Sequence, residues 1–224
     1  DHDEYERHYD VNSNYGGGCN DGLSRLLAYR GAQGANANVT IAVADHGFTL
    51  SMPLNRKVDI ERIIRGIDPD DARADLRASL SGTDLLKRYF RINATRALMI
   101  LKRYKGHEKS ASQQQVSSEM LLEFADGKDS FAVMEETYRE ILEDKLNVEA
   151  IEAFLGELAG DRIELSVTRV DSPTPRAFGL ATLAASDVVL AEDESAVLQE
   201  FHERVMAAIE DGDDASAVET DASD

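Results

Sequence analysis

The stretch TDLLKRYFRINATRALMILKRYKG, residues 83–106, carries the clearest structural signal in this sequence of 224 residues. Apolar residues recur at three- and four-residue steps from Leu86 to Tyr104, which is the spacing of one face of an amphipathic helix. Thr83 precedes the pattern as a helix N-cap, and Gly106 follows it as a C-terminal cap. The stretch predicts one long helix, and we expect a helix-dominated fold around it.

Further helices are predicted on both sides of this stretch. The patterns place them at about residues 19–30, from 58 onward, and at 112–124, 130–145, 148–158 and 193–210. Asp68 followed by Pro69 is a typical helix start, because Asp caps the first turn and proline fits its first position. We interpret Gly16-Gly17-Gly18 as a flexible turn before the first of these helices.

Strands are expected where β-branched residues cluster or where apolar and polar residues alternate. Residues 39–43 and 48–52 form a predicted hairpin around the turn Asp45-His46-Gly47. Residues 6–12 are expected to form a short strand, and residues 162–170 a further one. We therefore predict an α+β fold that is dominated by helices, with a small, mainly antiparallel sheet built from separated strands.

The chain is strongly acidic, with 43 acidic and 24 basic residues and a formal net charge of −19. Such a field argues against nucleic-acid or membrane binding through the overall charge. Alternatively, the acidity is that of proteins from halophilic archaea, in which case local charge indicates function. We expect a poorly defined N-terminal segment at 1–12, one domain at 13–210, and an acidic disordered tail at 211–224.

No catalytic or metal-binding signature is found in the sequence. The run of glycines is followed by Cys19 and Asn20, so it lacks the lysine and hydroxyl residue of a P-loop. The five histidines are not paired at metal-ligand spacing, and the single cysteine excludes an internal disulfide. Acidic residues cluster between Glu135 and Asp144, and in so acidic a chain we interpret them as a solvated helix face. No apolar run reaches the roughly 18 residues of a membrane span, and a cytoplasmic location is expected.

One segment opposes the acidic trend. Eight basic residues and one acid lie between Lys87 and Lys109, so the formal charge of this segment is +7. On a helical wheel, Lys87, Arg88, Arg91 and Lys102 gather on a face away from the apolar stripe. Two interpretations stay open at this point, namely an ordinary solvated face and contact with a phosphate backbone. The polar residues 110–115 that follow can donate hydrogen bonds to phosphate or sugar.

Specific motifs extend this interpretation. They are Lys87-Arg88-Tyr89-Phe90-Arg91, Ala94-Thr95-Arg96-Ala97, Tyr104-Lys105-Gly106 and the pair Gln114-Gln115. This series resembles the DEAD/H-associated region of Lhr-type (large helicase-related) ATP-dependent helicases. The resemblance covers roughly residues 13–210 and is densest at 84–115. The chain departs from the family pattern at Thr174-Pro175-Arg176, where an aromatic residue of the family's loop is lost, and the RecA-like motor and winged-helix domains are absent from the sequence.

The resemblance implies that residues 13–210 are a nucleic-acid-binding accessory domain of a superfamily 2 ATP-dependent DNA (or RNA–DNA) helicase with a role in DNA repair. The acidic composition adds the expectation that the protein comes from a halophilic archaeon. Its expected partners are single-stranded DNA or RNA, together with RecA-like motor and winged-helix domains in cis or in trans, and no membrane. No cofactor is expected in this chain, since ATP and Mg belong to the associated motor. The alternative function is a protein-interaction or oligomerisation module that docks a separate motor chain.

The residues predicted to contact nucleic acid belong to the basic segment or follow it. They are Lys87, Arg88, Arg91, Lys102, Arg103, Lys105, Lys109 and Gln114. Tyr89 lies near the edge of the apolar stripe and is a candidate for stacking on a base, whereas Tyr104 lies on the stripe and is expected in the core. Arg96 flanks the stripe, where a structural ion pair is the alternative to a phosphate contact.

Overall fold

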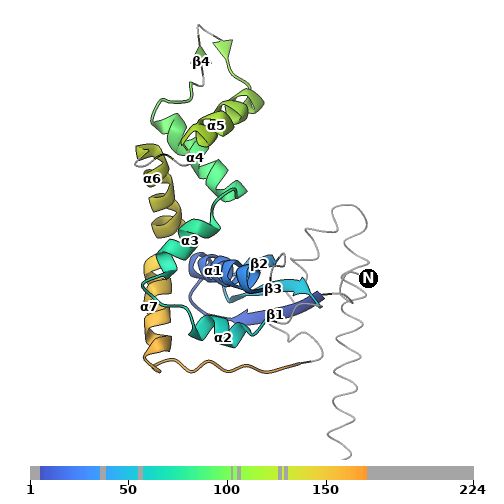
Figure 1. Cartoon of the computed structure of the whole chain (residues 1–224). Coiled ribbons are helices and arrows are strands. Elements are labelled where there is room, and N and C mark those ends of the chain that lie inside the picture. The colour runs from blue at the N-terminus through green and yellow to red at the C-terminus, as the bar shows by residue number, and fades with distance from the viewer. Residues whose placement is uncertain are drawn as a thin grey trace, which may run out of the picture.

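The computed structural model describes residues 6–35, 39–54, 58–101, 103–104, 107–125, 128 and 131–170 (Figure 1). The helices are α1 (Gly17–Ala35), α2 (Ile60–Arg65), α3 (Ala72–Ser79), α4 (Asp84–Arg96), α5 (Ala111–Ala125), α6 (Ala132–Arg139) and α7 (Val148–Ala159), with a π-helical segment η2 (Glu140–Lys145). The strands are β1 (Glu6–Asn12), β2 (Thr40–Ala44), β3 (Gly47–Pro53), β4 (Arg103–Tyr104) and β5 (His107–Glu108). The predicted helix-dominated α+β class is confirmed. The predicted helix at 193–210 and the acidic tail lie outside the described residues.

The main sheet has three antiparallel strands in the order β1-β3-β2. The hairpin predicted around Asp45-His46 joins β2 to β3, and the short strand predicted at 6–12 is β1. Gly47 pairs with Asn12 at one end of the sheet, where a Cβ atom would overlap the carbonyl oxygen of Val11. Glycine is therefore required at position 47 because two strands meet there without room for a side chain.

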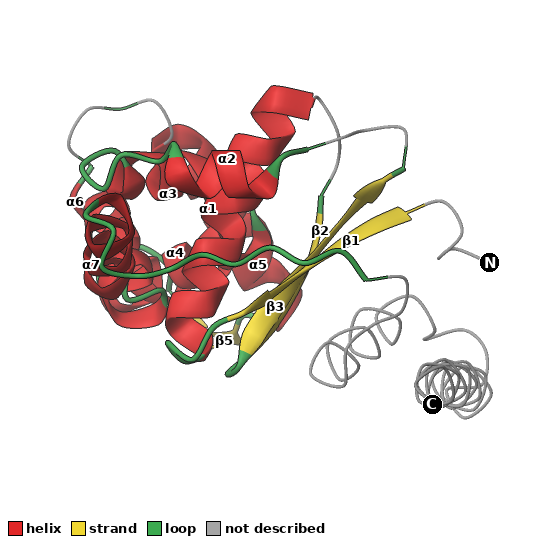
Figure 2. Ribbon diagram, turned by 90° about the horizontal axis from the view of Figure 1, so that it is seen from below, coloured by secondary structure: helices red, strands yellow, loops and turns green. Residues whose placement is uncertain are grey.

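Helix α1 covers the sheet, and Figure 2 shows the helices gathered on one side of it. Leu26 of α1 and both Phe48 and Leu50 of the central strand are fully or almost fully buried in the same apolar cluster. Asn20 attaches the hairpin turn to α1, since its Nδ2 donates to the carbonyl oxygens of Ala44 at 2.9 Å and Asp45 at 3.0 Å. Burial of these large apolar side chains supplies most of the driving force for this packing.

The glycine run at 16–18 is not the flexible turn that the sequence predicted. Gly17 and Gly18 form the first turn of α1, and only Gly16, with φ of 83°, adopts a left-handed conformation. A Cβ atom at Gly18 would lie 2.8 Å from the carbonyl oxygen of Lys145, and one at Gly22 would overlap the side chain of Ile151. The glycines inside α1 therefore allow its close packing against η2 and α7, which the interpretation as a turn missed.

The predicted single helix over residues 83–106 is wrong beyond Arg96. Leu98 has φ of 59°, the amide of Met99 donates to Ala94 O at 2.9 Å, and the amide of Leu98 donates to Thr95 O at 3.1 Å. This pair of bonds is a Schellman motif, which usually has glycine at the left-handed position. The chain then forms the small β4–β5 hairpin. A leucine in place of the usual glycine explains why the sequence pattern concealed the end of the helix.

Two further element predictions need correction. Residues 162–170 do not form a strand. An alternating segment becomes a strand only when a neighbouring strand pairs with its backbone, and among the described residues no strand pairs with this segment. The carbonyl oxygen of Leu165 instead accepts from the side chain of Arg65 at 3.5 Å. Helix α3 begins at Ala72 rather than at Pro69, because Asp68 Oδ1 accepts from the amide of Asp70 at 3.0 Å and stabilises a separate turn. The helix predicted at 130–145 is present, as α6 followed directly by the π-helical segment η2.

The described chain extends in two parts in Figure 1. We call residues 84–125, which contain α4, the β4–β5 hairpin and α5, the arm. Residues 6–83 and 131–170, which contain the main sheet with α1, α2, α3, α6, η2 and α7, are the body. The arm extends away from the main sheet and ends in the β4–β5 hairpin. Helix α6 packs against α4 and so connects the two parts.

Candidate nucleic-acid interface

Helix α4 presents the basic residues predicted from the sequence. Thr83 caps the helix, since its side chain accepts from the amide of Leu86 at 3.3 Å. One face of the helix buries Leu86 and Phe90, as the apolar spacing predicted, and this fixes the rotation of α4. Lys87 and Arg88 are exposed and Arg91 is half-buried. The three basic side chains therefore line the accessible surface of α4.

A groove with a volume of about 530 Å³ lies beside these side chains. Its lining comes from α1, α4 and α5: Arg25, Asp84, Leu85, Lys87, Arg88, Arg91, Gln115, Ser118, Glu119 and Leu122. Four of these residues are basic and two are acidic, so the lining is positive in a chain whose net charge is −19. A positive concave surface with a few apolar side chains is suited to a phosphate-bearing ligand.

The basic residues of the groove differ in how far they are neutralised. Lys87 Nζ lies 3.6 Å from Asp84 Oδ1 in an exposed pair, which contributes little in water. Arg88 and Arg91 form no ion pair with any residue in the described ranges. The guanidinium of Arg88 lies 5.7 Å from the centre of the Tyr89 ring. Two arginines are thus available for bidentate contact with phosphate.

The candidate base-stacking residue Tyr89 is half-buried and packs against the apolar core. Arg88 lies over its ring. A planar guanidinium on a ring is itself a favourable arrangement, worth about 0.5–1 kcal/mol at exposed sites. Stacking of a base on Tyr89 would therefore require Arg88 to move, and it stays a prediction.

The remaining predicted contacts follow α4. Arg103 is on β4 and Lys109 follows β5, at the far end of the arm from the main sheet (Figure 1). Arg103 Nη2 lies 3.8 Å from Glu108 Oε2 in an exposed pair. Tyr104 belongs to β4 and not to the stripe of a helix. The predicted contacts Lys102 and Lys105 lie outside the described residues.

The polar segment 110–115 is used for local structure. Ser110 and Gln113 form a capping box at the start of α5, with the amide of Ser110 donating to Gln113 Oε1 at 3.0 Å and the amide of Gln113 donating to Ser110 Oγ at 3.2 Å. Gln114 Nε2 donates to Lys109 O at 3.0 Å, and Gln115 Nε2 to Glu119 at 3.1 Å. Gln114 thus holds the end of the hairpin, and any contact with phosphate would compete with this bond.

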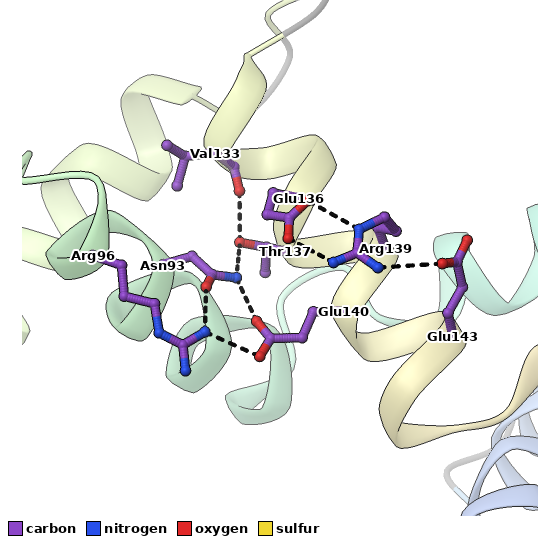
Figure 3. A network of polar contacts seen from close by, with 8 residues as sticks. All are labelled: Asn93, Arg96, Val133, Glu136, Thr137, Arg139, Glu140 and Glu143. Atoms are coloured by element: carbon purple, nitrogen blue, oxygen red, sulfur yellow. Dashed lines mark hydrogen bonds and ion pairs between the residues drawn. The ribbon is translucent and has the colours of Figure 1, made fainter.

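Arg96 is a structural residue, as the alternative interpretation held. Its Nη1 donates to Glu140 Oε1 at 3.2 Å and to Asn93 Oδ1 at 3.2 Å (Figure 3). Asn93 Nδ2 in turn donates to Glu140 Oε2 at 2.8 Å and to Thr137 Oγ1 at 3.3 Å. Asn93 and Thr137 are buried, so these bonds satisfy polar groups that would otherwise be costly. The network fixes α4 of the arm to α6 and η2 of the body.

The acidic cluster is a solvated helix face for most of its members, as the sequence predicted: Glu135, Glu136, Glu143 and Asp144 are exposed, and the first three also form ion pairs. Arg77 Nη2 donates to Glu135 Oε1 at 2.6 Å. Arg139 Nη2 donates to Glu136 Oε1 at 2.7 Å (Figure 3). These hydrogen bonds lower the pKa of both Glu135 and Glu136 from the usual value of 4.5. Arg73 similarly pairs with Glu143 at 3.4 Å. The pairs made by Arg73 and Arg77 could not be predicted from the sequence, because these arginines of α3 are distant along the chain, whereas Arg139 and Glu136 are three residues apart on one helix.

Other chemistry finds little support in the described part of the chain. No three His, Cys, Asp or Glu residues there are arranged to hold a metal ion. Burial raises the pKa of the Cys19 thiol to about 11, so the thiol stays protonated near neutral pH and is a poor nucleophile. None of the described helices is both long enough and apolar enough to cross a membrane.

Sequence reasoning missed Arg25 of α1 as part of the groove. The local sequence around Arg25 carries one structural signal, the Asp21 four residues before it, because residues four apart on a helix are neighbours and form ion pairs. That spacing predicts the pair with Asp21, at 2.7 Å between Nε and Oδ1. It does not indicate that α1 lies beside α4, which only the fold establishes.

Comparison with known proteins identifies the family. The sequence model of the DEAD/H associated family matches residues 1–177. The chain is 38% identical over 192 residues to "ATP-dependent helicase Lhr-Core protein 2" of Thermococcus barophilus, covering 85% of this chain and 22% of the relative. It is 35% identical over 207 residues to "ATP-dependent helicase Lhr-Core" of Sulfolobus acidocaldarius, covering 92% of this chain and 24% of the relative. It thus spans less than a quarter of either relative.

The fold is shared with the solved structure of the Mycobacterium smegmatis helicase Lhr bound to ssDNA and AMP-PNP. The TM-score is 0.67 at 24% sequence identity, over 78% of this chain and 22% of that chain. At this identity the likeness shows a common fold. Since the family model matches most of the sequence and the curated relatives are Lhr-Core helicases, the chain belongs to the DEAD/H-associated family of Lhr-type helicases.

Proposed function

We propose that this chain is the accessory region of an Lhr-type ATP-dependent helicase and that the basic face of α4 binds the backbone of a nucleic acid. The observation that carries the proposal is the pair Arg88 and Arg91, which line a positive groove and form no ion pair with any described residue. ATP and Mg²⁺ would act on RecA-like motor domains, with a winged-helix domain between motor and accessory region. The ssDNA in the similar Mycobacterium smegmatis structure supports a nucleic-acid ligand.

The charge balance of the chain explains why these arginines are informative. In a protein with 43 acidic residues, most of the described arginines are paired with carboxylates, as the Arg73, Arg77, Arg96 and Arg139 contacts show. Arginines left without such partners in a groove are positioned for an external anion. Phosphate contacts release condensed counterions, which makes the binding strongly dependent on salt.

The test is a salt titration of single-strand binding. Fluorescence anisotropy would follow a labelled oligothymidylate with the unmodified chain and with the triple variant Lys87→Ala/Arg88→Ala/Arg91→Ala. We expect the slope of log K against log salt to decrease by about 2, since each lost phosphate contact on a single strand contributes about 0.7. Far-UV circular dichroism and urea unfolding would check that the variant is folded.

The matched control is the triple variant Arg62→Ala/Arg162→Ala/Arg169→Ala. These residues are exposed, lie on the body and are not part of the groove lining, so the variant has the same change in net charge. It should keep most of the slope. Equal losses in both variants would mean that only net charge matters, and an unchanged slope in the α4 variant would overturn the proposed binding face.

A second candidate function rests on a different surface of the arm. Val116, Met120 and Phe124 of α5 are 53%, 67% and 60% exposed and lie four residues apart, on the side of α5 away from the buried Ser118 and Ala125. Contiguous exposed apolar side chains are typical of protein-binding surfaces. Since the chain spans less than a quarter of its helicase relatives, the partner proposed here is the motor-containing part of such a helicase.

This second candidate is tested by association with a motor. The motor-containing part of the Thermococcus barophilus relative would be mixed with this chain and analysed by size-exclusion chromatography with light scattering. Co-elution that is lost in the variant Val116→Ser/Met120→Ser/Phe124→Ser, with unchanged oligonucleotide binding, would support docking through α5. Self-association of this chain through the same residues would instead indicate an oligomerisation module.

A further inference from the structure

The groove contains one basic residue that comes from the body. Arg25 is on α1, whereas Lys87, Arg88 and Arg91 are on α4 and the remaining described lining residues come from α4 and α5. The side chain of Arg25 is 26% exposed, so it is held in place by its surroundings and is still accessible. A ligand in the groove would contact the body through α1 and the arm through α4.

The carboxylate next to Arg25 does not neutralise its surroundings. Asp21 Oδ1 lies 2.7 Å from Arg25 Nε, and Asp21 Oδ2 lies 3.3 Å from Lys145 Nζ. One carboxylate therefore serves two cations, and the three groups together keep a charge of +1. The contact with Asp21 uses Nε, so both terminal nitrogens of the guanidinium have hydrogen atoms to donate to another acceptor.

The size and lining of the groove indicate the class of ligand. Its volume of about 530 Å³ falls in the range of roughly 300–1,000 Å³ that is typical of pockets for one small molecule, which suits a nucleotide unit better than a duplex. Leu85 and Leu122 line the groove together with the basic residues. Apolar side chains favour contact with the sugar and the face of an unpaired base, which a duplex keeps stacked inside.

We propose that Arg25 binds a backbone phosphate of the strand from the α1 side of the groove. The proposal rests on the function proposed above and adds to it a contact residue on the body. A strand held in this way contacts the arm and the body at the same time.

The experiment compares two arginines on the same helix. Arg25→Ala should weaken binding of a labelled oligothymidylate about 5- to 10-fold at low salt and reduce the salt slope by about 0.7, which is the contribution of one single-strand phosphate contact. Arg30→Ala is the control, because Arg30 is also on α1 and pairs with Asp75, away from the groove lining. It should leave affinity and slope unchanged. Arg25→Lys should recover part of the lost affinity, since it restores the charge without the planar fork.

A change at the partner carboxylate separates binding from a structural role. If Arg25 contacts phosphate, Asp21→Asn raises the local charge from +1 to +2 and should increase the affinity two- to fivefold, opposite in sign to Arg25→Ala. If Arg25 served only its ion pair with Asp21, the two variants would weaken binding alike. The same measurements with a duplex of equal length should give weaker binding and a smaller effect of Arg25→Ala.

The outcomes distinguish this proposal from the function on which it rests. If the α4 triple variant loses slope while Arg25→Ala does not, the Arg25 contact is wrong and the proposed function stands. If neither variant changes binding, both are wrong. Equal effects of Arg25→Ala on single strands and on duplex would mean that Arg25 acts through its charge alone, and would overturn its contact in the groove.

Discussion

The body and the arm use apolar residues in opposite ways. The large side chains that are most completely buried in the described residues lie almost entirely in the body, including Leu26, Leu50 and Ile151. Phe90 is the arm's member of this group. In contrast, most of the large apolar side chains that are exposed belong to the arm: Ile92, Leu98, Met99, Leu101, Val116, Met120 and Phe124.

This difference separates the source of stability from the source of binding. The sheet, α1 and α7 bury enough apolar surface to stabilise the fold, whereas the arm is held mainly by its buried α4 face and by the Asn93–Glu140 network. The arm therefore has surface available for ligands, both at the basic face of α4 and at the apolar stripe of α5. Its amino-acid changes should affect binding more than folding.

The largest effect is expected from a cavity in the body. Leu26 is fully buried beneath the sheet, so Leu26→Ala should lower the free energy of unfolding by about 3–4 kcal/mol, as for other buried leucines. Met120→Ala, in the exposed stripe of the arm, should change it by less than about 0.5 kcal/mol. Urea unfolding followed by circular dichroism measures both. Similar losses in the two variants would remove the distinction between body and arm.

The next effect tests the close packing of α1 inside the body. A Cβ atom at Gly22 would overlap Ile151 and lie 3.2 Å from Leu146 O, so Gly22→Ala should destabilise the protein by about 1–3 kcal/mol. Gly156 in α7 has no neighbour within 4 Å of such an atom. Gly156→Ala should therefore stabilise by up to about 1 kcal/mol through helix propensity. A neutral Gly22→Ala variant, again in urea unfolding, would contradict the tight α1–α7 contact.

The connection between the two parts is tested at Asn93. Asn93→Ala removes the bonds to Thr137 and Glu140 and should cost about 1–2 kcal/mol, because it leaves buried polar groups with fewer partners. Hydrogen exchange should become faster in α4 and stay unchanged in β3. Gln115→Ala, which removes one exposed hydrogen bond, is the control and should alter neither. Uniform acceleration across the whole chain would show that arm and body unfold together.

A gain of stability is expected inside the arm. Leu98 is 78% exposed and occupies the left-handed position of the Schellman motif. Leu98→Gly should stabilise the protein by about 1 kcal/mol, because glycine adopts this conformation without the strain that a side chain causes. Thermal unfolding would register a higher Tm. A decrease would mean that the Leu98 side chain contributes packing that outweighs its backbone strain.

The smallest effect is expected from pH at the Arg77–Glu135 pair. Its hydrogen bond lowers the folded-state pKa of Glu135 below 4.5, so the pair stabilises the fold above that pH and the contribution is lost as pH falls through the folded pKa. Because the pair is about half exposed, the contribution should stay below about 1 kcal/mol. Glu135→Gln should flatten this part of the curve of unfolding free energy against pH. An equally steep curve in the variant would assign the loss to other carboxylates.

Local patterns predicted much of this molecule. The Thr83 cap, the apolar face of α4 and the β2–β3 hairpin follow from residues a few positions apart, and each is present in the fold. The resemblance to Lhr-type helicases followed from motifs in the same segment, and the family is confirmed. These features were accessible because backbone geometry and helix periodicity act over short distances along the chain.

Only the tertiary structure decided the rest. The left-handed Leu98 ends α4 against a continuing apolar pattern, and the segment at 162–170 alternates without forming a strand. Arg25 joins the basic groove, and Glu135 pairs with Arg77, because packing brings together residues that are far apart in sequence. The sequence alone determined which residues were basic, apolar or left without a local partner. Which of them meet depends on through-space contacts that no local pattern encodes.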